Sequence, residues 1–89
     1  MKVHELKIKQ NYFNDIRVND KSFEIRKNDR GFEVGDILLL KVIDEVTEEY
    51  TGHDMFIKVM YIHKGLGLAD GYVCMSIKRV WFYTESEVN

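Results

Sequence analysis

One uninterrupted apolar run, Ile37-Leu38-Leu39-Leu40, lies near the middle of the chain and directly follows the turn residues Val34-Gly35-Asp36. A short apolar run bounded by a turn is typical of a strand buried in a core. The chain has 89 residues, too few for two independent cores, so this strand must cross the core of one domain. We expect the strand to reach about Val46 and the domain to span residues 1–83, with residues 84–89 as a frayed tail.

The first part of the chain predicts a strand followed by a helix. In the segment from Val3 to Lys9, Leu6 and Ile8 fall on one side of an extended chain. The next segment, Gln10 to Asn19, has apolar and aromatic side chains at spacings of three and four, which is the pattern of an amphipathic helix of about two turns. We expect the helix to bury Tyr12, Phe13 and Ile16.

A second strand is predicted from Ser22 to Lys27 by strict alternation of side chains. Its apolar residues, Phe23 and Ile25, are expected to face the core. The polar face would then carry Ser22, Glu24 and Arg26.

The remaining segments predict a β-rich fold. Residues 55–63 form a strand that pairs with the central strand as a long hairpin, with the turn at 47–52, and residues 72–83 form a last strand or bent pair. Residues 64–71 contain three glycines and predict a mobile loop. One helix among five or six strands is typical of a mainly β (α+β) fold, a small closed or nearly closed β-barrel with the helix covering one end.

Charge and composition restrict the classes of function. The net charge is −2, yet residues 1–30 hold eight Lys or Arg against five Asp or Glu. A local positive patch of this kind suits a phosphate or a short oligonucleotide better than indiscriminate binding of nucleic acid. No apolar segment is long enough to cross a membrane and the N-terminus lacks the apolar stretch of a secretion signal, so we expect a cytoplasmic protein. The single cysteine, Cys74, excludes an intramolecular disulfide, and we expect neither a cofactor nor a metal.

The residues that carry chemistry are concentrated between Lys21 and Arg30. Lys21 lies at the corner between helix and strand, and Glu24 and Arg26 are two residues apart on one strand face, so the three side chains can converge. A guanidinium fits phosphate, an ammonium offers a point charge, and a carboxylate can accept from the exocyclic amine of a base. The alternative is a surface ion-pair network in which Glu24 bridges the two cations.

The run from Asn19 to Arg26 resembles the G-x-K-x-x-E-x-R signature of ASCH domains (activating signal cointegrator homology), a branch of the PUA-like superfamily. Segments 4–8, 23–40, 50–52 and 71–78 also look like a small bacterial and phage subgroup of that family known only as a domain of unknown function. The resemblance implies a PUA-like β-barrel with a cleft beside the signature. In that cleft Lys21, Glu24 and Arg26 would bind RNA or a modified nucleoside.

The match departs from the signature at Asn19, where the family has glycine. Asparagine is the non-glycine residue that best adopts a left-handed backbone, so we expect the turn to be kept. Some small relatives are amidohydrolases that remove the acetyl group from N4-acetylcytidine with a lysine, a threonine and a glutamate. Lys21 matches the lysine, and Lys21 with Glu24 would be catalytic if this chain were such an enzyme. Glu24 occupies the threonine position and favours a charged Lys21, so we expect binding, with hydrolysis as the alternative.

Other residues are secondary candidates. Lys27 and Arg30 flank a turn and could follow an RNA backbone, although Asp29 lies between them. The adjacent rings of Trp81, Phe82 and Tyr83 cannot all point inward from a strand. An exposed ring there would suit a homodimer contact or a protein-interaction module of phage or plasmid type, which is the third class of function we consider.

Overall fold

The computed structural model describes residues 1–81. Its elements follow the predicted order: β1 (Val3–Ile8), α1 (Gln10–Arg17), β2 (Phe23–Lys27), β3 (Ile37–Ile43), β4 (Tyr50–Lys64) and β5 (Tyr72–Val80). The prediction of a mainly β, α+β fold with one helix is confirmed for these residues. The predicted end of the domain at residue 83, the rings of Phe82 and Tyr83, and the tail at 84–89 lie outside them.

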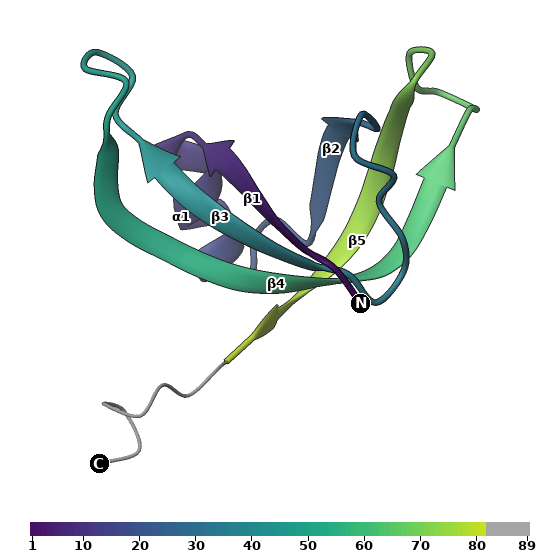
Figure 1. Ribbon diagram of the computed structural model, residues 1–89, viewed down its shortest axis with the longest axis horizontal. Helices are drawn as coiled ribbons and strands as arrows, with labels where there is room; N and C mark the ends of the chain where they lie inside the picture. The colour runs from purple at the N-terminus through teal and green to yellow at the C-terminus, as the bar shows by residue number, and fades with distance from the viewer. Residues whose placement is uncertain (82–89) are drawn as a thin grey trace.

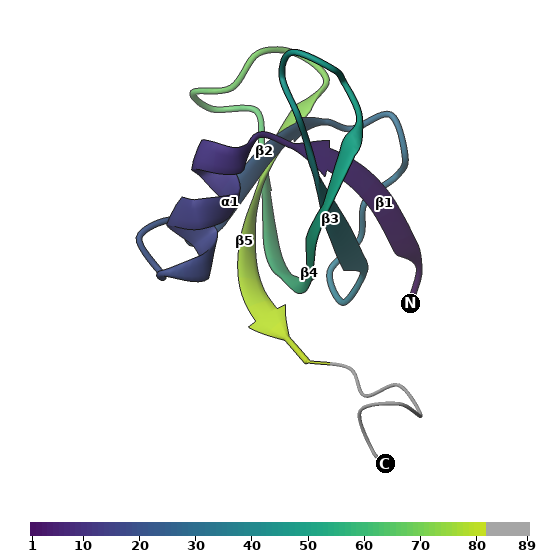
Figure 2. The same cartoon turned by 90° about the vertical axis from the view of Figure 1, so that its left-hand side faces the viewer.

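The five strands form one mixed sheet in the order β1-β3-β4-β5-β2. The sheet curls strongly into a barrel-like shape, with the long strand β4 bending across it (Figure 1). A view turned by 90° shows α1 on one side of the curled sheet (Figure 2). All neighbours are antiparallel except β1 and β3, which are parallel. A parallel pair needs a long crossover connection, and here α1 and β2 supply it.

The core lies inside the curl and is centred on β3. Leu38, Leu40 and Val42 alternate along this strand and have no exposed surface, as expected for one face of a half-buried strand. Helix α1 adds Phe13 and Ile16 to the same cluster. The prediction that Tyr12 is also buried is wrong, because Tyr12 is 45% exposed. It lies beside the buried stripe of the helix, which consists of Phe13 and Ile16.

The hairpin between β3 and β4 turns earlier than predicted. Strand β3 ends at Ile43 and β4 begins at Tyr50, so the turn occupies residues 44–49. The Asp44 carboxylate accepts hydrogen bonds from the backbone N–H groups of Val46 and Thr47 at 2.8 and 2.9 Å. An aspartate that satisfies the backbone of the next residues stabilises a turn, which ends the strand at this point.

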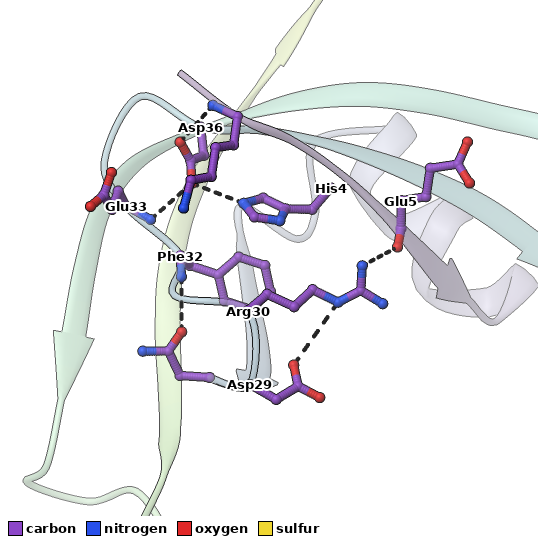
Figure 3. A network of polar contacts seen from close by, with 9 residues as sticks. His4, Glu5, Asp29, Arg30, Phe32, Glu33 and Asp36 are labelled. Atoms are coloured by element: carbon purple, nitrogen blue, oxygen red, sulfur yellow. Dashed lines mark hydrogen bonds and ion pairs between the residues drawn. The ribbon is translucent and has the colours of Figure 1, made fainter.

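A buried polar network joins the starts of β1 and β3 (Figure 3). The His4 ring nitrogen Nε2 lies 2.9 Å from Asp36 Oδ2, and the carboxylate also accepts from the backbone N–H groups of Lys2 and Glu33. Burial raises the pKa of the Asp36 carboxyl, but the hydrogen bond to His4, the two backbone hydrogen bonds and the charge of His4 lower it more. The pKa of Asp36 therefore lies below its ordinary value.

Asp36 should make the fold sensitive to acid. Because its pKa is depressed in the folded protein, its contribution is complete above the ordinary value of about 4 and is lost as the pH falls through the folded-state value. At neutral pH, Asp36→Asn should cost about 1 to 3 kcal/mol, since an amide cannot accept all the hydrogen bonds that the carboxylate accepts. Urea unfolding followed by circular dichroism gives the free energy of unfolding at each pH. In acid, this free energy should fall less steeply with decreasing pH in the variant than in the parent. Parallel profiles below pH 4 would contradict this role.

Candidate functional site

The two edges of the sheet, β1 and β2, are joined by arginine side chains. Arg26 Nη2 donates to the Lys7 carbonyl at 2.7 Å, and Arg30 Nη1 donates to the Glu5 carbonyl at 2.9 Å. A ladder of backbone hydrogen bonds would hold the two edge strands about 4.8 Å apart. Two side-chain bridges instead leave a gap between the edges, and the candidate site lies there.

The predicted convergence of Lys21, Glu24 and Arg26 is confirmed as geometry. Glu24 Oε1 accepts from Lys21 Nζ, and Glu24 Oε2 accepts from Arg26 Nε, both at 2.6 Å. The Glu24 side chain is 6% exposed, against 15% for Lys21 and 25% for Arg26. Each oxygen of the Glu24 carboxylate accepts from one of the two cations, so Glu24 holds both in place.

The expected orientation of β2 is wrong. Glu24 faces the interior, whereas Phe23 and Ile25, expected in the core, are 42% and 47% exposed. Alternation identifies the two faces of a strand but not which of them is buried. The buried carboxylate is stabilised here because cations from positions 21 and 26 satisfy both of its oxygens.

Lys21 is positioned by the turn after α1. Asn19 adopts the left-handed conformation with φ of 65°, as expected where the signature has glycine. The backbone N–H groups of Asp20 and Lys21 both donate to the Asp15 carbonyl, which fixes the corner. Lys21 Nζ then lies 5.4 Å from the centre of the Tyr12 ring and 5.0 Å from that of Phe23. The ammonium is therefore within cation–π distance of two aromatic rings, as well as bonded to the carboxylate.

A pocket of about 440 Å³ opens at this gap, a size that suits one nucleoside. Lys7 of β1 and Lys9, which directly follows that strand, line it opposite β2, and neither was predicted as a site residue. In the sequence, lysine alternates with apolar residues from Leu6 to Lys9. Only the curl of the sheet, however, brings this edge to face β2. The wall also includes Ile8, Tyr12, Lys21, Phe23, Glu24, Ile25 and Arg26.

The secondary candidates lie at the margin of this site. Arg30 donates a hydrogen bond to the Glu5 carbonyl, and its Nε lies 4.0 Å from Asp29 Oδ1 (Figure 3). Lys27 ends β2, pairs in register with Tyr72 of β5 and is exposed. Neither residue lines the pocket, so a backbone-tracking role for them remains a prediction.

The arrangement suits binding of an anion better than hydrolysis. The pocket carries four cations, Lys7, Lys9, Lys21 and Arg26, and one carboxylate that is already paired. A lysine that acts as a base needs a free lone pair, but Lys21 Nζ donates to Glu24 and to the Phe23 carbonyl at 2.8 Å. Within residues 1–81, no group of three or more His, Cys, Asp and Glu side chains is placed to hold a metal. In the same part of the chain, no helix has the length and apolar character to cross a membrane.

Comparison with known proteins identifies related sequences and folds. The family model DUF3850, a domain of unknown function, matches residues 3–77. Among solved structures, the crystal structure of the hypothetical protein PH0355 is similar with a TM-score of 0.62 and 18% sequence identity, covering 90% of this chain and 100% of that chain. At this identity the similarity shows the fold alone. A search of curated proteins found no match.

Proposed function

We propose that this chain, which belongs to the DUF3850 family, binds RNA by taking one nucleotide, or a modified nucleoside, into the pocket between β1 and β2. The observation that carries the proposal is the pocket wall, where four cationic side chains and the exposed ring of Tyr12 surround a single paired carboxylate. Lysine and arginine neutralise phosphate, and an aromatic ring provides a stacking surface for any base.

Each side chain has a distinct role in the proposed complex. Lys7 on β1 and Lys9 at the start of α1 are exposed and contact phosphate. Tyr12 stacks on the base. Glu24 positions Lys21 and Arg26, whose partly exposed cationic groups face the same pocket, so the carboxylate acts through its partners.

The resemblance of residues 19–26 to the ASCH signature supports the same proposal. The left-handed Asn19 and the joined Lys21, Glu24 and Arg26 side chains are the features that the signature implies. Membership of the PUA-like superfamily is therefore part of the proposal, and so is a cytoplasmic location, where an RNA ligand would be met.

Variants at Tyr12 and Lys7 test RNA binding, because neither side chain is one of the ion-pair partners of Glu24. Binding is measured by fluorescence anisotropy with a labelled single-stranded RNA of about four nucleotides, so that phosphates flank the nucleotide in the pocket. Tyr12→Ala should weaken binding roughly fivefold to a hundredfold by removing a stacking surface. Lys7→Ala should lower the slope of log affinity against log salt concentration by about 0.7, the value for one phosphate of a single strand.

Lys2→Ala is the matched control, because Lys2 is exposed and does not line the pocket. It should leave binding unchanged. Lys21→Ala and Arg26→Ala should abolish binding. Because both residues contact a buried carboxylate, only variants whose circular dichroism matches that of the parent are informative. Equal RNA affinity of the parent, Tyr12→Ala and Lys7→Ala proteins would refute the proposal. Acetate release from N4-acetylcytidine would instead support the amidohydrolase.

A second candidate function, contact with another protein, is favoured by one observation. Trp81 is 72% exposed, with the Arg79 guanidinium 4.0 Å from the centre of its ring. An exposed tryptophan beside an arginine is typical of interface residues. This function becomes the leading one if no RNA binds.

A further inference from the structure

The outer surface of β2, β5 and β4 carries side chains of which only Phe23 also lines the pocket. We refer to Phe23, Lys27, Lys58, Tyr61, Tyr72 and Lys78 together as the outer face. Ser76 of β5 pairs in register with Phe23 on one side and with Tyr61 on the other. The three residues therefore form one row across three neighbouring strands, which lie side by side in Figure 1.

Exposed aromatic side chains occupy this face. Tyr61 is 65% exposed, Phe23 42% and Tyr72 41%. Side chains stand roughly perpendicular to a sheet, and serine is much smaller than the rings on either side of it. The row thus presents two rings, Phe23 and Tyr61, separated by the small side chain of Ser76. Such rings are costly to leave in water without a partner, so a cluster of them indicates a binding surface.

The charges of the outer face have one sign. Lys58 and Lys78 lie directly opposite each other in the β4–β5 register, two positions along β5 from Ser76. Like charges directly opposite destabilise a sheet. Within residues 1–81, neither lysine, nor Lys27, has a carboxylate within ion-pair distance. Residues 55–81 hold four Lys or Arg and one acidic residue, Asp70, and Asp70 is in none of the ion pairs found within residues 1–81.

We propose that a second, single-stranded segment of the bound RNA lies across the outer face, with bases stacked on Tyr61 and Phe23 and phosphates near Lys58 and Lys78. This inference rests on the proposed function and extends its site. Phe23 connects the two surfaces, because it lines the pocket and also belongs to the row. Lys27 pairs with Tyr72, and from Tyr72 to Lys78 strand β5 extends about 20 Å. This length is enough for several nucleotides.

The chemistry of the face favours RNA over other occupants. A second copy of this chain in a two-fold contact would bring the same patch against itself, so lysines would meet lysines with no carboxylate between them. An acidic peptide would satisfy the lysines but would leave the tyrosine and phenylalanine rings without a planar partner. Single-stranded nucleic acid supplies both a negative backbone and flat bases.

The test compares two RNA lengths on the full chain. Binding of labelled single-stranded RNAs of about four and about ten nucleotides is measured over a range of salt concentrations, the shorter probe being too short to fill the pocket and also cross the outer face. The parent should bind the longer RNA more tightly. Tyr61→Ala should remove this gain, weakening the longer RNA roughly fivefold to a hundredfold, whereas Tyr61→Phe keeps the ring and should bind normally. Lys58→Ala with Lys78→Ala should lower the salt slope for the longer RNA by about 1.4.

The outcomes separate this inference from the proposed function. Both outer-face variants should bind the shorter RNA like the parent, and Lys2→Ala should match the parent with both probes. If the longer RNA gains no affinity, or if Tyr61→Ala and the double lysine variant bind it normally, the outer face is not a contact surface although the pocket still binds. If the parent binds neither RNA, the proposed function fails as well. Binding of polyglutamate that depends on Lys58 and Lys78 but not on Tyr61 would overturn the RNA assignment in favour of an acidic peptide.

Discussion

Replacement of Glu24 by alanine is expected to lower the free energy of unfolding by about 3 kcal/mol, near the lower end of the range for breaking a buried ion pair. The Glu24 side chain is 6% exposed and is the shared partner of Lys21 and Arg26. Its removal leaves two partly buried cations without their counter-charge. Because these cations are 15% and 25% exposed, they can turn partly toward water, which moderates the loss. Chemical unfolding followed by circular dichroism measures the effect.

The control replaces the whole network. A variant with methionine at 21, 24 and 26 removes all three charges and keeps the side-chain volumes similar, and substitutions of this kind are often neutral or stabilising. It should recover most of the stability lost in Glu24→Ala while failing to bind RNA. A loss of less than about 1 kcal/mol in Glu24→Ala would instead identify a surface ion-pair network, the alternative considered from the sequence.

Several features of the site were predictable because they depend on local sequence. The corner at Asn19 follows from the ability of asparagine to adopt a positive φ, and the structure has φ of 65° there. The convergence of Lys21, Glu24 and Arg26 follows from spacing along a turn and one strand, and the three side chains are in contact. Interactions over two to five residues are set by local backbone geometry, so they can be derived without knowing the fold.

The features that were missed depend on which distant elements meet. Which face of β2 is buried cannot be derived from alternation, since it depends on the curl that turns Glu24 inward. Lys7 and Lys9 join the pocket because β1 and β2 are the two edges of one sheet, and no local pattern reports that closure. The positive outer face was not predicted, because residues 31–89 carry a net negative charge as a whole. The acidic residues of this segment are concentrated before Met55, so the strands of the outer face are locally positive.

The interior of β3 should tolerate truncation poorly. Leu38 is fully buried on a strand that pairs with β1 on one side and β4 on the other. Leu38→Ala should cost about 2 to 5 kcal/mol through lost burial and a residual cavity. A domain of this size has roughly 5 to 10 kcal/mol in total, so the melting temperature should fall by at least about 10 °C.

Leu39→Ala is the matched control, because it removes the same atoms from the next residue of the same strand. Leu39 is only half-buried and faces the opposite side of the sheet, so its truncation should cost less than about 1 kcal/mol. From sequence alone the run Ile37-Leu38-Leu39-Leu40 is equally apolar at every position, and only the register of β3 separates the two leucines. Equal losses at 38 and 39 would mean that β3 is covered on both faces, and the curled sheet with a single interior would then be wrong.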